Sequence, residues 1–161
     1  MKKEQQRESA QIEAALKKKG VTAQKTPNGA YIQITNAGDA SAKATQGKLV
    51  TVNYKGSLLE NGKVFDSNTD TTVSQRTEPY KLTIGQRGAI EGWDDGLRLF
   101  NEGGKGKLYI PSMLAYGPNP PQGAPFKAFE NLMFDVEVVK VEDAKPMSQR
   151  PVMPPTQRPN N

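Results

Sequence analysis

Hydrophobic and polar residues alternate with a period of two through much of the middle of this chain, a pattern typical of half-buried β-strands. Within residues 49–56, for example, Val50, Val52 and Tyr54 share one face while polar side chains occupy the other. Comparable alternation occurs in residues 29–35, 80–84, 108–110 and 132–138. Because each strand has one apolar face, the pattern predicts about five antiparallel strands around a single core.

One helix interrupts these strands. Ile90, Trp93, Leu97 and Phe100 follow the spacing i, i+3, i+7, i+10, which places them on a single apolar stripe. The pair Gly103-Gly104 predicts the end of this segment. We therefore predict an α+β domain in which an antiparallel sheet wraps around one short helix.

The two ends of the chain differ from this middle part. Residues 3–19 are rich in Glu, Gln, Ala and Lys, which favour a helix, but its apolar face is narrow, with Ile12 and Leu16. Such a helix could be solvated and partly frayed, or it could be a docking helix or a dimerisation helix that forms a homodimer. We predict a helical extension and linker over 1–28, a folded domain over 29–142, and a disordered Pro-rich tail over 143–161.

Composition and charge limit the chemistry. The chain has no Cys and no His, which excludes thiol and imidazole catalysis and the usual zinc sites. We expect no metal and no cofactor. Residues 1–25 carry a formal charge of +4 and residues 143–161 carry +2, whereas residues 26–142 carry −1. A nucleic-acid-binding domain would carry its basic patch on the folded body, so this function class is not expected.

Five motifs occur in order along the predicted domain. They are Val-Thr-Val-Asn-Tyr-Lys-Gly (50–56), Asn-Gly-Lys-Val-Phe-Asp-Ser (61–67), Ile-Gly followed by Ala-Ile-Glu-Gly-Trp (84–93), Ala-Tyr-Gly (115–117) and Leu-Met-Phe-Asp-Val-Glu-Val (132–138). Each motif alone is weak, but together they resemble the FKBP domain of peptidyl-prolyl cis/trans isomerases. The resemblance covers about 115 of the 161 residues.

The resemblance implies an isomerase of X–Pro peptide bonds that assists protein folding, with an aromatic pocket. It assigns catalytic roles to Asp66 and Tyr116. Substrate-binding roles fall to Tyr54, Phe65, Tyr80, Ala89, Ile90, Trp93, Phe126 and Phe134. Taken singly, these residues would more simply be core or turn residues; the ordered motifs favour a pocket. The implied partners are proline-containing polypeptides and inhibitors of the tacrolimus and rapamycin type.

The sequence departs from the family pattern in three places. Ala89 stands where the family usually has Val, and residues 68–78 are longer than in the minimal domain. The segment 118–129 also differs, and Phe126 and Phe129 within it predict a preference for bulky apolar residues before proline. These departures leave open a second function, a chaperone or protein-binding module with little turnover.

The cellular location is open at the sequence level. No apolar run approaches the ~20 residues that span a bilayer, and no apolar stretch follows the charged start, so no intact signal peptide is expected. The layout of helix, linker and domain resembles that of bacterial envelope FKBPs. We therefore expect a mature form from the bacterial envelope or periplasm, with a cytoplasmic protein as the alternative.

Overall fold

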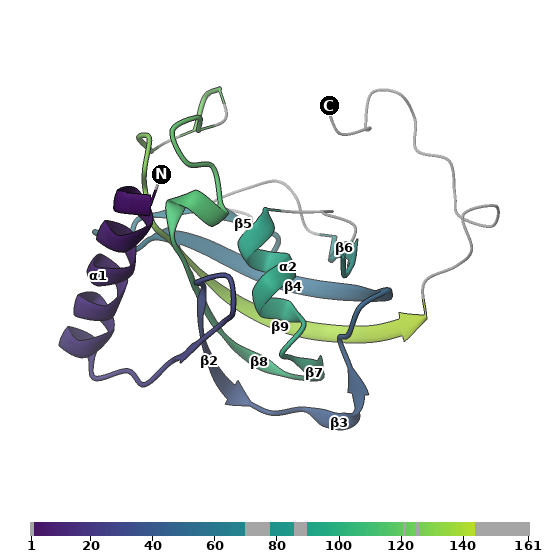
Figure 1. Ribbon diagram of the computed structural model, residues 1–161. Helices are drawn as coiled ribbons and strands as arrows, with labels where there is room; N and C mark the ends of the chain where they lie inside the picture. Colours follow the sequence, from purple (N-terminus) through teal and green to yellow (C-terminus); the bar gives the residue numbers. More distant parts are fainter. Residues whose placement is uncertain (1, 70–77, 86–89, 121, 125, 144–161) are drawn as a thin grey trace.

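The computed structural model describes residues 2–69, 78–85, 90–120, 122–124 and 126–143, and its main element is a twisted antiparallel sheet (Figure 1). Its strands, in spatial order, are β1 (Gln24–Lys25), β2 (Tyr31–Asn36), β8 (Lys105–Ile110), β9 (Leu132–Asp143), β4 (Lys48–Leu58) and β5 (Val64–Ser67). A seventh strand, β6 (Tyr80–Thr83), pairs with β4 as well. A separate two-stranded sheet joins β3 (Asp39–Lys43) to β7 (Asn101–Glu102).

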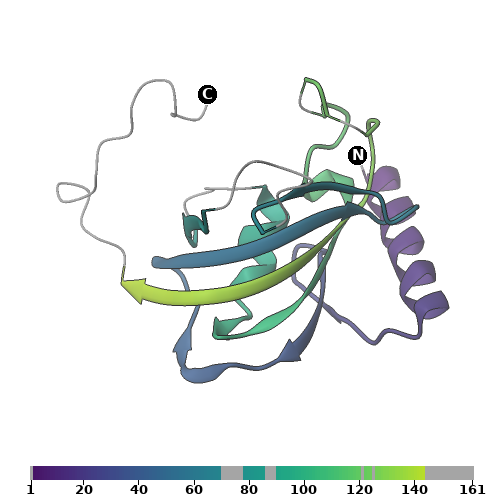
Figure 2. The same cartoon turned by 180° about the vertical axis from the view of Figure 1, so that it is seen from behind.

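The centre of the sheet is the long pair β4 and β9. Their register runs from Lys48↔Asp143 to Leu58↔Leu132, and Figure 2 shows the two strands side by side with α2 (Glu91–Leu97) behind them. The predicted α+β class is thus confirmed. Among the described residues the sheet has seven strands rather than about five. The sequence pattern did not reveal β1, because it has only two residues, or β5, because it lies in a motif without alternation.

Helix α2 lies close against one face of the sheet. Gly92 and Gly96 face β8, where a Cβ at Gly92 would collide with Ile110 and one at Gly96 would lie 2.8 Å from Leu108. The absence of side chains at these two positions lets the helix approach the strand. Of the predicted apolar stripe, Trp93, Leu97 and Phe100 are buried in the main core, with Trp93 only 4% exposed, and Ile90 is partly buried against it.

The N-terminal helix α1 (Lys2–Lys19) packs at one end of the sheet (Figure 1). Ile12 and Leu16 form a second buried cluster with Tyr31 and Tyr109. These tyrosines pair across β2 and β8 and alternate with residues of the main core. The expectation of a solvated, frayed helix is therefore wrong, because its narrow apolar face is buried against Tyr31 and Tyr109 on the second face of the sheet.

Other sequence expectations have different outcomes. A turn at Asn61-Gly62 lies between β4 and β5, with φ +74° at Gly62 and the N–H of Lys63 donating to Asn61 Oδ1. The division of the chain at residue 28 stays a prediction, although β1, inside the expected linker, pairs with β2. The Pro-rich tail lies outside the described residues beyond Asp143. Within the described part, no helix is long and apolar enough to cross a membrane.

Candidate active site

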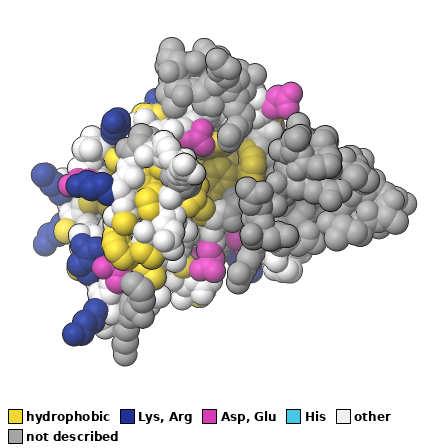
Figure 3. All heavy atoms as spheres, turned by 90° about the horizontal axis from the view of Figure 1, so that it is seen from above, with side chains coloured by type: hydrophobic (Ala, Val, Ile, Leu, Met, Phe, Trp, Pro, Cys, Tyr) yellow, Lys and Arg dark blue, Asp and Glu magenta, His cyan; other side chains and the backbone are white. Residues whose placement is uncertain are grey.

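A small aromatic pocket opens where the sheet, the start of α2 and the segment after η1 (Ser112–Leu114) meet. Its volume is about 150 Å³, well below the ~300–1,000 Å³ of sites for drug-sized ligands. It is lined by Tyr54, Phe65, Asp66, Tyr80, Ile90, Trp93, Tyr116 and Phe134. All eight are among the ten predicted site residues. Viewed from above, hydrophobic side chains gather around a hollow on this side of the molecule (Figure 3).

Trp93 is the centre of the aromatic walls. Its ring meets those of Tyr54, Tyr80 and Phe134 edge to face, with centroid separations of 5.0, 5.7 and 5.3 Å. Edge-to-face contacts are a favoured arrangement of aromatic rings, and they hold each ring in one orientation. Phe65 extends the wall by packing on Phe134 at 5.8 Å. The pocket therefore has a rigid apolar floor built from α2, β4, β5, β6 and β9.

Asp66 supplies a carboxylate with a fixed orientation at the edge of this floor. Its Oδ2 accepts a hydrogen bond from the hydroxyl of Tyr54 at 2.8 Å, and its Oδ1 accepts one from the N–H of Ser67 at 2.8 Å. Charge-assisted hydrogen bonds of this kind are strong and directional. The two bonds leave the carboxylate little freedom to rotate.

Asn68 is a supporting residue that the sequence analysis missed. Its side chain is buried and bonds to three backbone groups in two segments: it accepts from the N–H of Tyr54 at 2.8 Å and donates to the carbonyls of Val52 and Glu78 at 3.0 and 3.2 Å. It thus ties the end of β5 to β4 and to the residues before β6. An Asn in a polar run gives no sequence signal for such a role.

Tyr116 and Phe126 come from the loop 115–131, which follows η1. The rings of Phe126 and Tyr116 are 5.8 Å apart, and Phe126 also packs on Phe65 at 5.1 Å. Phe126 does not line the pocket itself but backs two residues that do. Ala89, the tenth predicted residue, lies outside the described residues.

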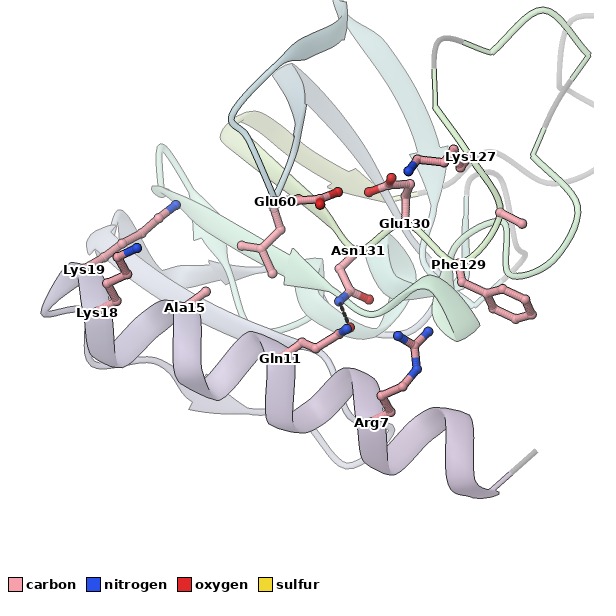
Figure 4. Close-up of a pocket in the computed structure, with 12 residues that line it drawn as sticks. Arg7, Gln11, Ala15, Lys18, Lys19, Glu60, Lys127, Phe129, Glu130 and Asn131 are labelled. Atoms are coloured by element: carbon pink, nitrogen blue, oxygen red, sulfur yellow. Dashed lines mark hydrogen bonds between the residues drawn. The ribbon is translucent and has the colours of Figure 1, made fainter.

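A larger cavity of about 830 Å³ lies between α1, the turn after β4 and residues 127–131 (Figure 4). Its lining mixes cationic side chains such as Lys18 and Lys127 with the carboxylates of Glu60 and Glu130. Burial, followed by the nearby charge of Glu60, raises the pKa of Glu130. We take the smaller pocket as the candidate active site, because its aromatic walls and fixed carboxylate converge on one small volume.

The chemistry available in the pocket is non-covalent. Its polar groups are hydroxyls and one carboxylate. The described residues contain no group of three or more acidic, His or Cys side chains that could hold a metal ion. Such a pocket can bind an apolar ring and contact a neighbouring amide. Within the described chain, the buried indole N–H of Trp93 has no hydrogen-bond partner.

The sequence model of the family described as "FKBP-type peptidyl-prolyl cis-trans isomerase" matches residues 40–139. The chain is 42% identical over 99 residues to an FK506-binding protein of Neisseria meningitidis serogroup B, covering 62% of this chain and 84% of that protein. It is 41% identical over 115 residues to FK506-binding protein 1 of Candida glabrata, covering 70% and 93%.

The crystal structure of FkpA from Escherichia coli superposes with a TM-score of 0.66 at 33% identity. The match covers 90% of this chain but only 64% of the FkpA chain. The predicted family and fold are therefore confirmed. The chain belongs to the FKBP-type peptidyl-prolyl cis-trans isomerases.

Proposed function

We propose that this peptidyl-prolyl isomerase binds the proline of an X–Pro segment in the aromatic pocket and accelerates rotation of the preceding peptide bond there. One observation carries the proposal: the residues that the family motifs assign to substrate converge on a single small cavity around Trp93. Its volume of about 150 Å³ suits one ring of a bound ligand, such as a proline ring.

The physics of the reaction fits this pocket. Rotation about a peptide bond faces a barrier of ~18–20 kcal/mol because amide resonance must be broken. Uncatalysed X–Pro exchange takes tens to hundreds of seconds. The planar amide is more polar than the twisted transition state, so transfer from water into an apolar site favours the twisted form. The enzyme then binds the transition state more tightly than the ground state, and no bond to the protein is needed.

Asp66 and Tyr116 have distinct proposed roles. The Tyr116 hydroxyl donates a hydrogen bond to a substrate carbonyl, which holds the chain while the bond rotates. The Asp66 carboxylate is held in place by hydrogen bonds from Tyr54 and Ser67, and its negative charge interacts with the carbon of the rotating carbonyl group. Neither residue acts as a general base, because no proton is transferred in the reaction.

The test is the rate of cis–trans exchange in X–Pro tetrapeptides with Asp66→Leu, Asp66→Asn and Tyr116→Phe. Loss of one neutral hydrogen bond, ~0.5–1.5 kcal/mol, predicts a roughly 2- to 12-fold fall in kcat/KM for Tyr116→Phe. Loss of the carboxylate predicts a fall of roughly 10- to 100-fold for Asp66→Leu, with Asp66→Asn as the isosteric control. If neither position lowers the rate in folded protein, the assigned roles are wrong.

Tacrolimus and rapamycin are proposed as ligands of the same pocket, supported by the FK506-binding names of the relatives. Inhibition of exchange by rapamycin, lost in Trp93→Leu, is the expected result. The alternative, a chaperone or binding module with little turnover, predicts rapamycin binding without measurable acceleration of exchange in the wild-type protein.

Two further proposals are an envelope location and a homodimer that forms through α1. The first is supported by the layout of helix, connection and domain, and is tested by fractionation of cells that express the native gene. For the second, Ile12 and Leu16 are already buried within the chain, so a dimer would use other residues of α1. Sedimentation equilibrium measures its oligomeric state.

A further inference from the structure

Two buried polar residues close the base of the loop 115–131. Ser112 begins η1, just before the loop, and Asn131 is the last residue of the loop; their exposures are 1% and 7%. The N–H of Ser112 donates to Asn131 Oδ1 at 3.1 Å, and the carbonyl of Asn131 accepts from the N–H of Leu59 at 3.0 Å. The loop is thereby tied across its base and fixed to the end of β4.

Ser112 also determines where Tyr116 lies. Its carbonyl accepts hydrogen bonds from the N–H groups of Ala115 at 2.8 Å and Gly117 at 2.7 Å, the two residues that flank Tyr116. The carbonyl of Gly117 in turn accepts from the N–H of Phe129 at 2.8 Å. A movement of Ser112 would therefore move the backbone on both sides of Tyr116.

Helix α1 holds both of these base residues. Glu8 Oε2 accepts a hydrogen bond from the Ser112 hydroxyl, and Glu8 Oε1 accepts one from the N–H of Met113 at 3.1 Å. One turn later, Gln11 Oε1 accepts from Asn131 Nδ2 at 2.9 Å (Figure 4). Residues three apart lie on the same face of a helix, so Glu8 and Gln11 can form hydrogen bonds to both sides of the loop base at once.

Glu8 is costly to place there. Its residue exposure is 0%, and burying a carboxyl group is unfavourable unless hydrogen bonds compensate. Burial raises the pKa of Glu8 to about 7, with a hydrogen bond to Glu4 adding to the rise, while Ser112 and Met113 lower it. The helix is already anchored to the sheet by Ile12 and Leu16. The hydrogen bonds of Glu8 and Gln11 join α1 to the base of the loop, a connection that the apolar contacts of Ile12 and Leu16 do not make.

We propose that Glu8 and Gln11 are positioning residues for isomerisation, which act through Ser112 and Asn131 on Tyr116 and Phe126. Both lie on α1, before residue 40, where the match to the family model begins, so this support for the loop comes from outside the matched residues. The inference rests on the proposed role of Tyr116 in substrate binding.

The experiment compares Glu8→Ala, Glu8→Gln and Gln11→Ala in the full chain. Glu13→Gln is the matched control, because Glu13 accepts from the Tyr31 hydroxyl and so joins α1 to the sheet without contacting the loop. The readouts are kcat/KM for Leu-Pro and Ala-Pro peptides, the ratio of the two, and the fluorescence of Trp93, the only tryptophan.

We expect Glu8→Ala to lower kcat/KM by roughly 3- to 30-fold, within the ~10²-fold that a 1 Å misplacement can cost. The Leu-Pro to Ala-Pro ratio should change too, because the loop carries Phe126. Simple destabilisation would lower both rates in proportion and leave the ratio unchanged. Gln11→Ala should act in the same direction, and Glu13→Gln should leave the ratio as in the wild type.

A double-mutant cycle separates this inference from the proposed function. If Glu8 acts through Tyr116, the effect of Glu8→Gln on kcat/KM should be much smaller in a Tyr116→Phe background. Additive effects would overturn the inference, as would an unchanged ratio in both Glu8→Ala and Gln11→Ala. If Glu8→Ala does not fold, Glu8→Gln decides by the same ratio and cycle. Failure of the proposed function is recognised separately, by a Tyr116→Phe variant with the wild-type rate.

Discussion

The buried carboxyl of Glu8 should make the stability of this protein fall as the pH rises from 5 to 8. Its pKa in the folded state is about 7, above the ordinary 4.5, chiefly because burial disfavours the charged form. A group whose pKa is raised by folding contributes stability that is complete below the unfolded pKa and is lost as the pH passes the folded one. At pH 8 the folded protein must keep an ionised Glu8 out of water.

The magnitude follows from the displacement of the pKa. At 1.36 kcal/mol per unit, the full displacement corresponds to ~3 kcal/mol of unfolding free energy. We expect about 1–2 kcal/mol, because the first turns of α1 can open locally and relieve the buried charge before the sheet unfolds. On a chain of this length that corresponds to a fall in Tm of roughly 2–8 °C.

The other charged groups beside Glu8 are Glu4 and Arg7, both on α1. The pKa of Glu4 is lowered, mainly by its hydrogen bond with Arg7, so Glu4 is already ionised throughout this window. Arg7 stays charged, with its pKa raised by the same bond. The chain has no His or Cys, so few other groups titrate between pH 5 and 8.

The assay is urea denaturation at pH 5, 6, 7 and 8, followed by Trp93 fluorescence and circular dichroism. Glu8→Gln is neutral at every pH, so its unfolding free energy should change less across this range, by about the 1–2 kcal/mol assigned to Glu8. Comparing the two proteins also cancels the contribution of the terminal amino group, because this group titrates in both. The reasoning is refuted if both proteins show the same pH dependence, or if the wild type gains stability relative to Glu8→Gln toward pH 8.

Two further predictions concern the walls of the pocket. In Gly56→Ala, the new Cβ would lie 2.7 Å from the Phe134 ring and 2.9 Å from that of Phe65, so both walls must shift. We expect kcat/KM to fall by roughly tenfold and stability by ~1–3 kcal/mol; an unchanged rate would show that the walls tolerate the shift. In Phe126→Ala, loss of the ring behind Phe65 and Tyr116 should reduce any preference for Leu or Phe before proline, measured with an X–Pro peptide series. If Phe126→Ala keeps the wild-type preference, Phe126 does not determine which residue is favoured before proline.

Eight of the ten residues that the sequence assigned to the site line one cavity, and several of them carry two signals at once. Trp93 lies on a helical stripe of period 3.6, and Tyr54 and Phe134 lie on strands of period two, so the elements and the motifs agree. The placement of α1 was missed, although a trace of it was present: Tyr31 and Tyr109 are apolar positions on the opposite face from Ile32 and Leu108.

The contacts of Glu8 had no such signal. A glutamate on a charged helix is ordinarily solvated, and nothing local shows that it will be buried. Its partners, Ser112 and Met113, lie more than 100 residues away along the chain. Only the packing of α1 on the second face of the sheet brings them together, and this packing depends on tertiary structure rather than on local pattern.

This arrangement divides the active site into two parts with different sensitivities. Trp93, Tyr54 and Phe134 belong to α2 and the central strands and are part of the main core. Tyr116 and Phe126 belong to a loop whose position depends on a few hydrogen bonds to Ser112 and Asn131, and through them on α1. Changes in the first group should abolish binding of proline itself. Changes in the loop or in α1 should instead alter which X–Pro segments are favoured, because they move the residues beside the proline and leave the floor intact.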